Sequence, residues 1–214
     1  MLVATIHGMT PASSASDDRR AHTRERLRSA AMRLFLAQGF EQTTVAQIAA
    51  AAQLSQMTFF RYFPTKEDAV LSDEHDDLMV ELIRAQPAGD PALQRVHAAV
   101  RTGLDRIYPQ TRNELLARST LILTTPSLRS RLADNLAASQ ATFERALGSA
   151  EGEVDLSTRV VASVASACLA AAVTAWVASA GREELPGLVD RAFADLHREA
   201  RSLVPHQLEQ ERAG

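Results

Sequence analysis

The amino-acid sequence predicts an all-α protein of about nine helices: a small N-terminal domain of three helices arranged as a helix-turn-helix, then a larger helical body. Apolar residues recur at helical spacing along most of the 214-residue chain, and no segment keeps the alternation of a strand. Two short helical patterns within residues 45–63 are separated by a turn of about three residues, which is helix-turn-helix spacing. Hydrophobic residues form 46% of the chain, enough to build a core.

The first segment, residues 1–20, lacks helical periodicity and contains TPASSASDD, so it is predicted to be a disordered tail. A second methionine at position 9 leaves open whether residues 1–8 belong to the native chain. The helical period begins near Thr23, and Arg28 and two neighbouring arginines fall largely off the apolar face. Gly39 is expected to cap the end of this helix, and Phe40 to fold back onto it.

Two short helices are predicted next. Thr43 or Thr44 is the expected N-cap of the second helix, and Ser55 is the expected N-cap of the third, which Pro64 ends. A helix this short is unstable alone, so one face must pack on its neighbours while the other stays free. The packing face comprises Leu54, Phe59 and Phe63.

The body is read as helices and loops, with clusters of proline and glycine at the helix ends. Thr65 is expected to cap its first long helix. The predicted helices span residues 66–86, 90–107, 110–125, 127–147, 156–180 and 185–203. The predicted domains are accordingly 21–66 for the helix-turn-helix and 67–205 for the body, with a frayed polar tail over 206–214.

The net charge of −3 conceals an uneven distribution. Residues 19–66 contain eight basic and two acidic residues, whereas the chain from residue 67 onward contains 15 basic and 22 acidic residues. A basic first quarter on an acidic body indicates a module that binds a polyanion. Lys66, the only lysine, falls at a predicted helix N-terminus, where free backbone N–H groups also favour an anion.

The free face of the third helix suits the major groove of DNA, which admits an α-helix and displays base edges. Hydroxyl groups suit phosphate oxygens, Gln56 suits adenine, and Arg61 suits guanine or a phosphate. The side chains available for polar contacts are Ser55, Gln56, Thr58, Arg61 and Tyr62. The alternative is a pair of short core helices with a solvated face, but the basic charge favours DNA.

Three motifs then point to a family: Phe-x-x-x-Gly-Phe over residues 35–40, Thr-Thr-Val over 43–45, and Tyr-Phe-Pro-Thr-Lys-Glu over 62–67. They resemble the DNA-binding domain of TetR-family transcriptional regulators over about residues 23–71. The resemblance implies a homodimer formed through the helices near 156–180 and 185–203. It also implies a palindromic operator on double-stranded DNA, and repression relieved when a variable helical domain binds a small apolar or acyl-type inducer.

Position by position, the resemblance assigns DNA contacts to residues of the first 66 positions. Phosphate contacts fall on Thr44, Thr58, Tyr62 and Lys66. Contacts with bases or backbone fall on Gln47, Ser55, Gln56, Met57, Phe60 and Arg61.

Three residues depart from the family pattern. Gln53 stands in a turn where glycine is usual, and a left-handed backbone there would cost ~1 kcal/mol. Met57 replaces a usual glycine and Phe60 a usual tyrosine, which exchanges a phosphate contact for an apolar one, such as a thymine methyl. These departures concern which operator is read.

The body resembles the TetR subgroup whose C-terminal domain is described as acyl-CoA-like ligand-binding and includes mycofactocin-type regulators, through the TPSLR junction and the helix lengths. An acyl-CoA requires an apolar channel with cations at its mouth. The resemblance implies a channel lined by Leu121, Phe143, Cys168, Ala172 and Trp176, with Arg118, Arg129 and Arg131 near phosphates. In the alternative interpretation, the same residues form a plain helix-bundle core with solvated arginines.

The remaining features favour a cytoplasmic regulator without cofactor or metal. The apolar segment 160–180 is alanine-rich and contains serines, so a buried helix is favoured over a membrane span. Residues 73–77, DEHDD, are read as a solvated acidic surface, because His75 points away from Asp73 and Asp77 on a helix. No apolar signal segment follows the Arg19-Arg20 pair.

No catalytic motif is found in the sequence, so enzyme activity is not expected. A small-molecule enzyme or a helical binding protein without a DNA partner is the alternative class.

Overall fold

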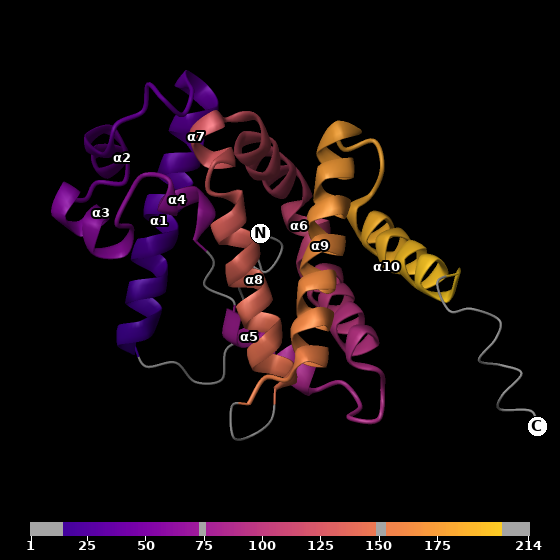
Figure 1. Cartoon of the computed structure of the whole chain (residues 1–214). Coiled ribbons are helices and arrows are strands. Elements are labelled where there is room, and N and C mark those ends of the chain that lie inside the picture. Colours follow the sequence, from indigo (N-terminus) through magenta and orange to yellow (C-terminus); the bar gives the residue numbers. More distant parts are fainter. Residues whose placement is uncertain (1–14, 73–75, 149–152, 203–214) are drawn as a thin grey trace, which may run out of the picture. The chain divides into compact units, whose positions relative to one another are not determined.

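The computed structural model describes residues 15–72, 76–148 and 153–202, which contain ten α-helices and no strand (Figure 1). This confirms the predicted all-α class. The chain divides into two compact units: one combines the residues up to 77 with 106–135, and the other combines 78–105 with the residues from 136 onward.

Helix α1 spans Ala15–Gln38 and begins earlier than the sequence indicated. Residues 15–20, predicted to belong to a disordered tail, are helical; no glycine or proline interrupts the chain between positions 15 and 38. Residues 1–14 of that predicted tail lie outside the described residues. Gly39 ends the helix with φ +88° and donates its N–H to the Phe35 carbonyl at 3.0 Å. Phe40 folds back, its ring centre 4.8 Å from that of Phe35, as predicted.

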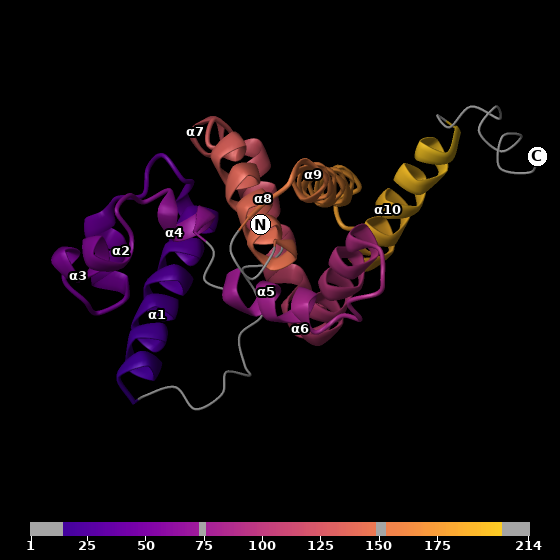
Figure 2. The ribbon, with the colours of Figure 1, turned by 60° about the horizontal axis from the view of Figure 1, so that its bottom comes forward.

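Helices α2 (Val45–Ala51) and α3 (Gln56–Tyr62) form the predicted helix-turn-helix beside α1 (Figure 2). Thr44 is the N-cap of α2 and forms a capping box with Gln47, in which each side chain bonds the other's backbone N–H. Ser55 caps α3 by accepting the N–H of Thr58 at 3.0 Å. Both predicted caps are therefore confirmed.

The helix predicted over 66–86 is wrong in its extent, because the chain forms α4 (Asp68–Leu71) and α5 (Asp76–Arg84) instead. Ser72 is extended, with φ −68° and ψ 140°, and its hydroxyl donates to the carbonyl of Asp68. This side-chain bond competes with the next helical turn. Residues 73–75 lie outside the described residues, and most of the predicted acidic surface lies there.

The middle of the body also differs from prediction in two places. Helix α6 runs unbroken over Ala92–Thr124 and contains Pro109, where the sequence indicated a break. Proline costs ~3 kcal/mol inside a helix, and the buried Ile107 and Leu115 on either side offset that cost. The predicted helix 127–147 is two, α7 (Pro126–Arg129) and α8 (Leu132–Leu147), separated where the Ser130 hydroxyl donates to the Ser127 carbonyl.

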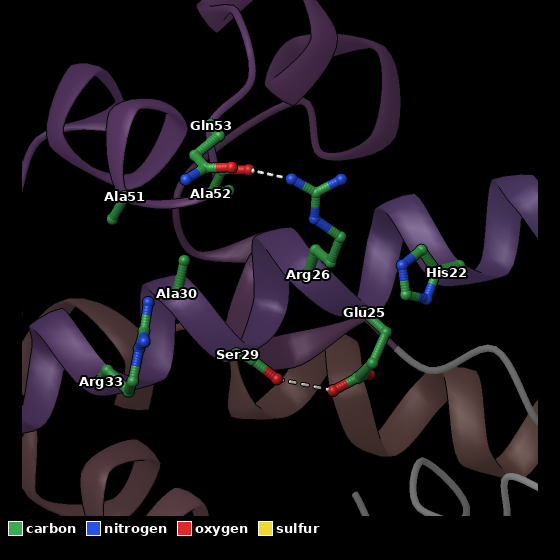
Figure 3. A pocket seen from close by; sticks show the side chains of 9 residues that line it. All are labelled: His22, Glu25, Arg26, Ser29, Ala30, Arg33, Ala51, Ala52 and Gln53. Carbon is green, nitrogen blue, oxygen red and sulfur yellow. Dashed lines mark hydrogen bonds between the residues drawn. The ribbon is translucent and has the colours of Figure 1, made fainter.

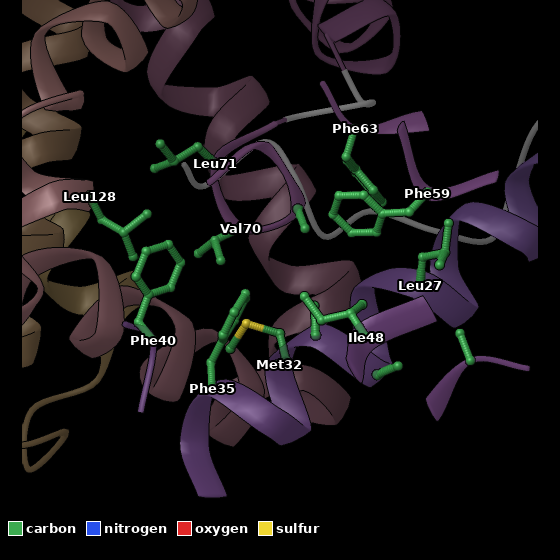
Figure 4. Packing of buried hydrophobic residues seen from close by; sticks show 14 of the residues in the cluster. Leu27, Met32, Phe35, Phe40, Ile48, Phe59, Phe63, Val70, Leu71 and Leu128 are labelled. Atoms are coloured by element: carbon green, nitrogen blue, oxygen red, sulfur yellow. The ribbon is translucent and has the colours of Figure 1, made fainter. Parts of the chain in front are cut away.

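The core of the first unit extends beyond the three N-terminal helices (Figure 4). Phe35, Phe40 and Val70 belong to the same buried cluster as Ile122 at the end of α6 and Leu128 of α7. The predicted boundary between 21–66 and 67–205 therefore divides residues that share a core.

In the second unit, α9 (Leu156–Ala178) packs against α10 (Leu185–Ser202). Helix α9 is long and apolar enough to cross a membrane by length and composition, but a row of its side chains from Ala162 to Trp176 is buried within the protein. The predicted tail 206–214 lies outside the described residues.

Candidate nucleic-acid interface

Helix α3 has one buried face and one exposed face. Phe59 and Phe63 are fully buried, with ring centres 5.6 Å apart, and Leu54 packs against the same cluster. Met57 and Phe60 are 83% and 52% exposed. The predicted division of this helix is confirmed: aromatic residues anchor it from behind. The exposed residues of the helix are Gln56, Met57, Phe60 and Arg61.

The hydroxyl groups at the start of α2 and α3 are fixed by local bonds. Ser55 Oγ lies 2.9 Å from Thr58 Oγ1. Thr44 donates its backbone N–H to Gln47 Oε1 at 2.8 Å, and Gln38 Nε2 donates to the same oxygen at 3.1 Å. These bonds orient hydroxyl groups at two helix N-termini, where backbone N–H groups already favour phosphate.

The Lys66 ammonium group is held inside the domain. It donates to the backbone carbonyls of Phe40 at 3.0 Å and Thr43 at 3.4 Å, lies over the Phe40 ring, and has Glu41 Oε2 at 3.9 Å. Its side chain is only 20% exposed. The predicted phosphate contact of Lys66 stays a prediction, because the described bonds assign it first to the loop between α1 and α2.

Three arginines of α1 also bind backbone carbonyls, a role that sequence reasoning missed. Arg24 Nη1 donates to the Tyr62 carbonyl at 3.4 Å and its guanidinium covers the Phe63 ring. Arg26 Nη2 donates to the Ala52 carbonyl at 2.7 Å, at the end of α2. Helix C-termini carry unsatisfied carbonyls and a partial negative charge, so these cations stabilise them.

The prediction that Arg28 lies off the apolar face of α1 is wrong, because its side chain is buried. It donates to the carbonyl of Ser72, beyond the end of α4. The four-residue spacing of Arg24 and Arg28 could have indicated this role, since it places both side chains on one face of α1. Part of the basic charge of this domain therefore holds the fold together, and the exposed Arg20, Arg33 and Arg61 have no ionic partner among the described residues.

The predicted ligand-site residues fall into two groups. Arg118 is 6% exposed and its Nε donates to the Val70 carbonyl at 2.7 Å, while the half-buried Leu121 packs against the core of the first unit. Arg131 Nη1 lies 3.0 Å from Asp68 Oδ1, and Arg129 is exposed. Two of the three predicted cations thus bind the α4 segment.

The second group lies in the other unit. Phe143 and Trp176 are fully buried, and Cys168, Ala172 and Trp176 follow each other at four-residue intervals on one face of α9. Cys168 Sγ lies 3.8 Å from the Ala192 carbonyl of α10, and burial raises the pKa of its thiol. Within the described ranges, no group of His, Cys, Asp and Glu residues has the geometry of a metal site.

A helix-turn-helix whose third helix exposes Gln56 and Arg61, joined to an all-α body, defines a class of DNA-binding regulators. The family model for "Bacterial regulatory proteins, tetR family" matches residues 27–71, and that for the "MftR C-terminal domain" matches residues 90–201, about half of the chain. The chain belongs to the TetR family of transcriptional regulators, which have a helix-turn-helix DNA-binding domain and a ligand-binding C-terminal domain.

One curated relative is similar in sequence, and solved structures are similar in fold. The HTH-type transcriptional regulator TcmR of Streptomyces glaucescens is 41% identical over 87 residues, which are 40% of this chain and 38% of that regulator. The fatty acid degradation regulator FadR of Bacillus halodurans has 22% identity and a TM-score of 0.53 over 80% of this chain and 93% of its own. FadR of Thermus thermophilus, in complex with lauroyl-CoA, has 25% identity and a TM-score of 0.50 over 80% and 91% of the two chains.

Proposed function

We propose that this protein is a homodimeric repressor that binds a palindromic operator through α3 and is released by a small apolar or acyl-type ligand. The exposed face of α3 carries the proposal. It presents an amide, a guanidinium and two apolar side chains, while two fully buried phenylalanines fix the helix from behind. A helix held this way can enter the major groove without losing its own packing.

The roles along α3 follow from chemistry and exposure. Gln56 and Arg61 read base edges, since an amide pairs with adenine and a guanidinium with guanine. Met57 and Phe60 contact apolar atoms in the groove, such as thymine methyl groups. Thr44, Gln47, Ser55, Thr58 and Tyr62 place hydroxyl, amide and backbone N–H groups toward the DNA backbone, which fixes the register of the helix.

The exposed face of α9 supports a homodimer. The exposed Arg159 lies beside the start of a row of uncharged exposed residues, which recur at intervals of three or four positions: Leu156, Val160, Ser163, Ala167, Ala171, Thr174 and Ala178. Leu156 at the start of this face is 77% exposed. Small side chains at this spacing let a second helix approach closely, so α9 and α10 of two copies would pack together. A two-fold dimer presents two α3 helices about one DNA turn apart to a palindrome.

The inducer is proposed to be acyl-like because the MftR-type domain covers the body and the Thermus thermophilus relative binds lauroyl-CoA. Buried Phe143, Cys168, Ala172 and Trp176 supply apolar surface for such a ligand. Arg118 and Arg131 bind the backbone of Val70 and the carboxylate of Asp68, so a ligand that moved α6 or α8 would act directly on α4. A ligand with different affinity for two dimer states would then shift the population that fits the operator.

The test is a mobility-shift and anisotropy titration with DNA from upstream of the protein's own gene. The titration is repeated over a series of salt concentrations. A dimer making several phosphate contacts should lose roughly 10³-fold or more in affinity between 50 and 200 mM salt. Gln56→Ala and Arg61→Ala should change the preferred operator sequence. Addition of lauroyl-CoA should release the DNA. Absence of any binding at low salt would argue for the non-DNA alternative.

A further inference from the structure

A groove of about 380 Å³ lies between α1 and the turn that follows α2 (Figure 3). None of the residues predicted to contact the operator lines it. The lining residues are His22, Glu25, Arg26, Ser29, Ala30, Arg33, Ala51, Ala52 and Gln53.

The charge that faces this groove is positive. Arg33 is exposed and has no hydrogen-bonding or ionic partner among the described residues, and Arg26 uses one amino group on the Ala52 carbonyl. The acidic Glu25 is already engaged, because Ser29 Oγ donates to it at 2.8 Å and Arg28 lies 3.8 Å away. Two guanidinium groups therefore retain free N–H groups on the groove side of α1.

The groove lies next to the start of the recognition helix. Gln53 forms its rim and precedes Ser55, the N-cap of α3, by two residues. Recognition helices contact base edges with their N-terminal residues, so the backbone of bound DNA runs close to that end of α3. On the other wall Ala51 and Ala52 have short side chains, which leave room for a phosphate and its sugar.

We propose that this groove binds the sugar–phosphate backbone flanking the base pairs that α3 reads. Arg33 and Arg26 bind phosphate oxygens, and the Gln53 amide donates a hydrogen bond to the same strand. The contact carries no sequence information; it extends the footprint of each subunit and adds to its salt dependence. This inference rests on the proposed DNA binding, which the following experiment tests separately.

The experiment measures the affinity of the full-length protein for two duplexes by fluorescence anisotropy over a salt series. Both contain the sequence that the protein selects from a random pool; one ends at its borders and the other extends six base pairs beyond each border. The variant is Arg33→Gln, which removes one exposed charge. The matched control is Arg106→Gln, which changes an exposed arginine on α6 whose side chain has no ionic or hydrogen-bonding partner among the described residues, and it should leave both affinities unchanged.

The wild type should bind the extended duplex more tightly and with a steeper salt slope than the short one. Arg33→Gln should lose the part of that increment that Arg33 supplies, about one unit of slope per subunit, while its affinity for the short duplex stays at the wild-type level. For a dimer, the loss of affinity of Arg33→Gln for the extended duplex should therefore be roughly ten-fold larger at 50 mM than at 200 mM salt. Neutral methylphosphonates at the flanking positions should weaken the wild type more than they weaken Arg33→Gln, which retains only the contacts of Arg26 and Gln53.

Two results would overturn the inference. Equal affinity of Arg33→Gln and the wild type for the extended duplex would remove the groove from the interface. Equal weakening on both duplexes would place Arg33 over the core operator instead. In either case DNA binding by the wild type would still stand, whereas failure of the wild type to bind any duplex would overturn the proposed function itself.

Discussion

The ammonium group of Lys66 lies 3.0 Å from the carbonyl oxygen of Phe40 and 4.4 Å from the centre of the Phe40 ring. Through these contacts Lys66, two residues before α4, holds the loop that leads from α1 into α2. Thr44, which caps α2, follows the carbonyl of Thr43 that the same ammonium group also binds. The only lysine of the chain thus fixes the position of a helix N-terminus proposed to bind phosphate.

Replacing Lys66 with methionine should lower the free energy of unfolding by about 2 kcal/mol, because charged hydrogen bonds to partly buried carbonyls contribute about 1.5–3 kcal/mol each. Urea denaturation measures this loss. DNA affinity should fall for all sequences alike, since the start of α2 is displaced. The control, Arg61→Met, removes an exposed charge and should leave stability within about 0.5 kcal/mol of the wild type. Unchanged stability with a reduced salt slope would instead make Lys66 a direct phosphate contact.

Gln53 has a left-handed backbone, with φ 54°, which is the conformation for which strain was expected at this departure from the family pattern. Gln53→Gly should raise the free energy of unfolding by about 0.5–1 kcal/mol, because glycine adopts positive φ without a steric penalty. Thermal and urea denaturation test this. The matched control is Ala50→Gly, an exposed position inside α2, which should be destabilised by a similar amount. A loss of stability in both variants would show that the Gln53 side chain makes a compensating contact.

Local chemistry explains why the N-terminal helices could be predicted. Thr44, Ser55 and Gly39 act through bonds to residues at most four positions away, so sequence spacing reveals them. The same holds for the anchoring of α3 by Phe59 and Phe63, which follows from helical periodicity.

The roles of the charged residues could not be predicted in this way, because their partners lie far along the chain. Arg24 binds a carbonyl 38 positions away and Arg118 one 48 positions away. Counting charges along the sequence treats such side chains as exposed, although they donate hydrogen bonds to backbone carbonyls within the fold. At Pro109 the local sequence predicts a helix break that does not occur. The burial of side chains on both sides of this proline overrides the local preference.

Arg118 should therefore behave as a structural residue. Arg118→Met should lower the free energy of unfolding by about 2 kcal/mol, because the Val70 carbonyl loses a charged donor at 2.7 Å in a buried setting. Urea denaturation without ligand measures this. Arg129→Met, at an exposed position nearby in sequence, is the control and should be neutral. If Arg118→Met kept full stability and lost only lauroyl-CoA binding, the predicted ligand role would replace the structural one.

Asp155 should make the stability of α9 depend on pH. Its carboxylate accepts the backbone N–H of Thr158 at 2.7 Å, and this bond lowers the pKa of Asp155 below its ordinary value of 3.8. Because the folded-state pKa is depressed, the stabilisation is fully present above pH 3.8 and is lost as the pH falls through the lower folded-state value. Asp155→Ala should lower the Tm at neutral pH, and its difference from the wild type should narrow below pH 3.8.

Asp155→Asn separates the charge from the cap, because asparagine caps helices about as well as aspartate but does not titrate. Its stability should lie between those of the wild type and Asp155→Ala at pH 7, and its difference from Asp155→Ala should stay constant as the pH falls. The proposed dimer face begins at Leu156, the residue after the cap, so fraying of this turn should also weaken self-association. Sedimentation of Asp155→Ala at neutral pH should then show a larger monomer fraction than that of the wild type, and an unchanged fraction would place the dimer contact elsewhere on α9 or α10.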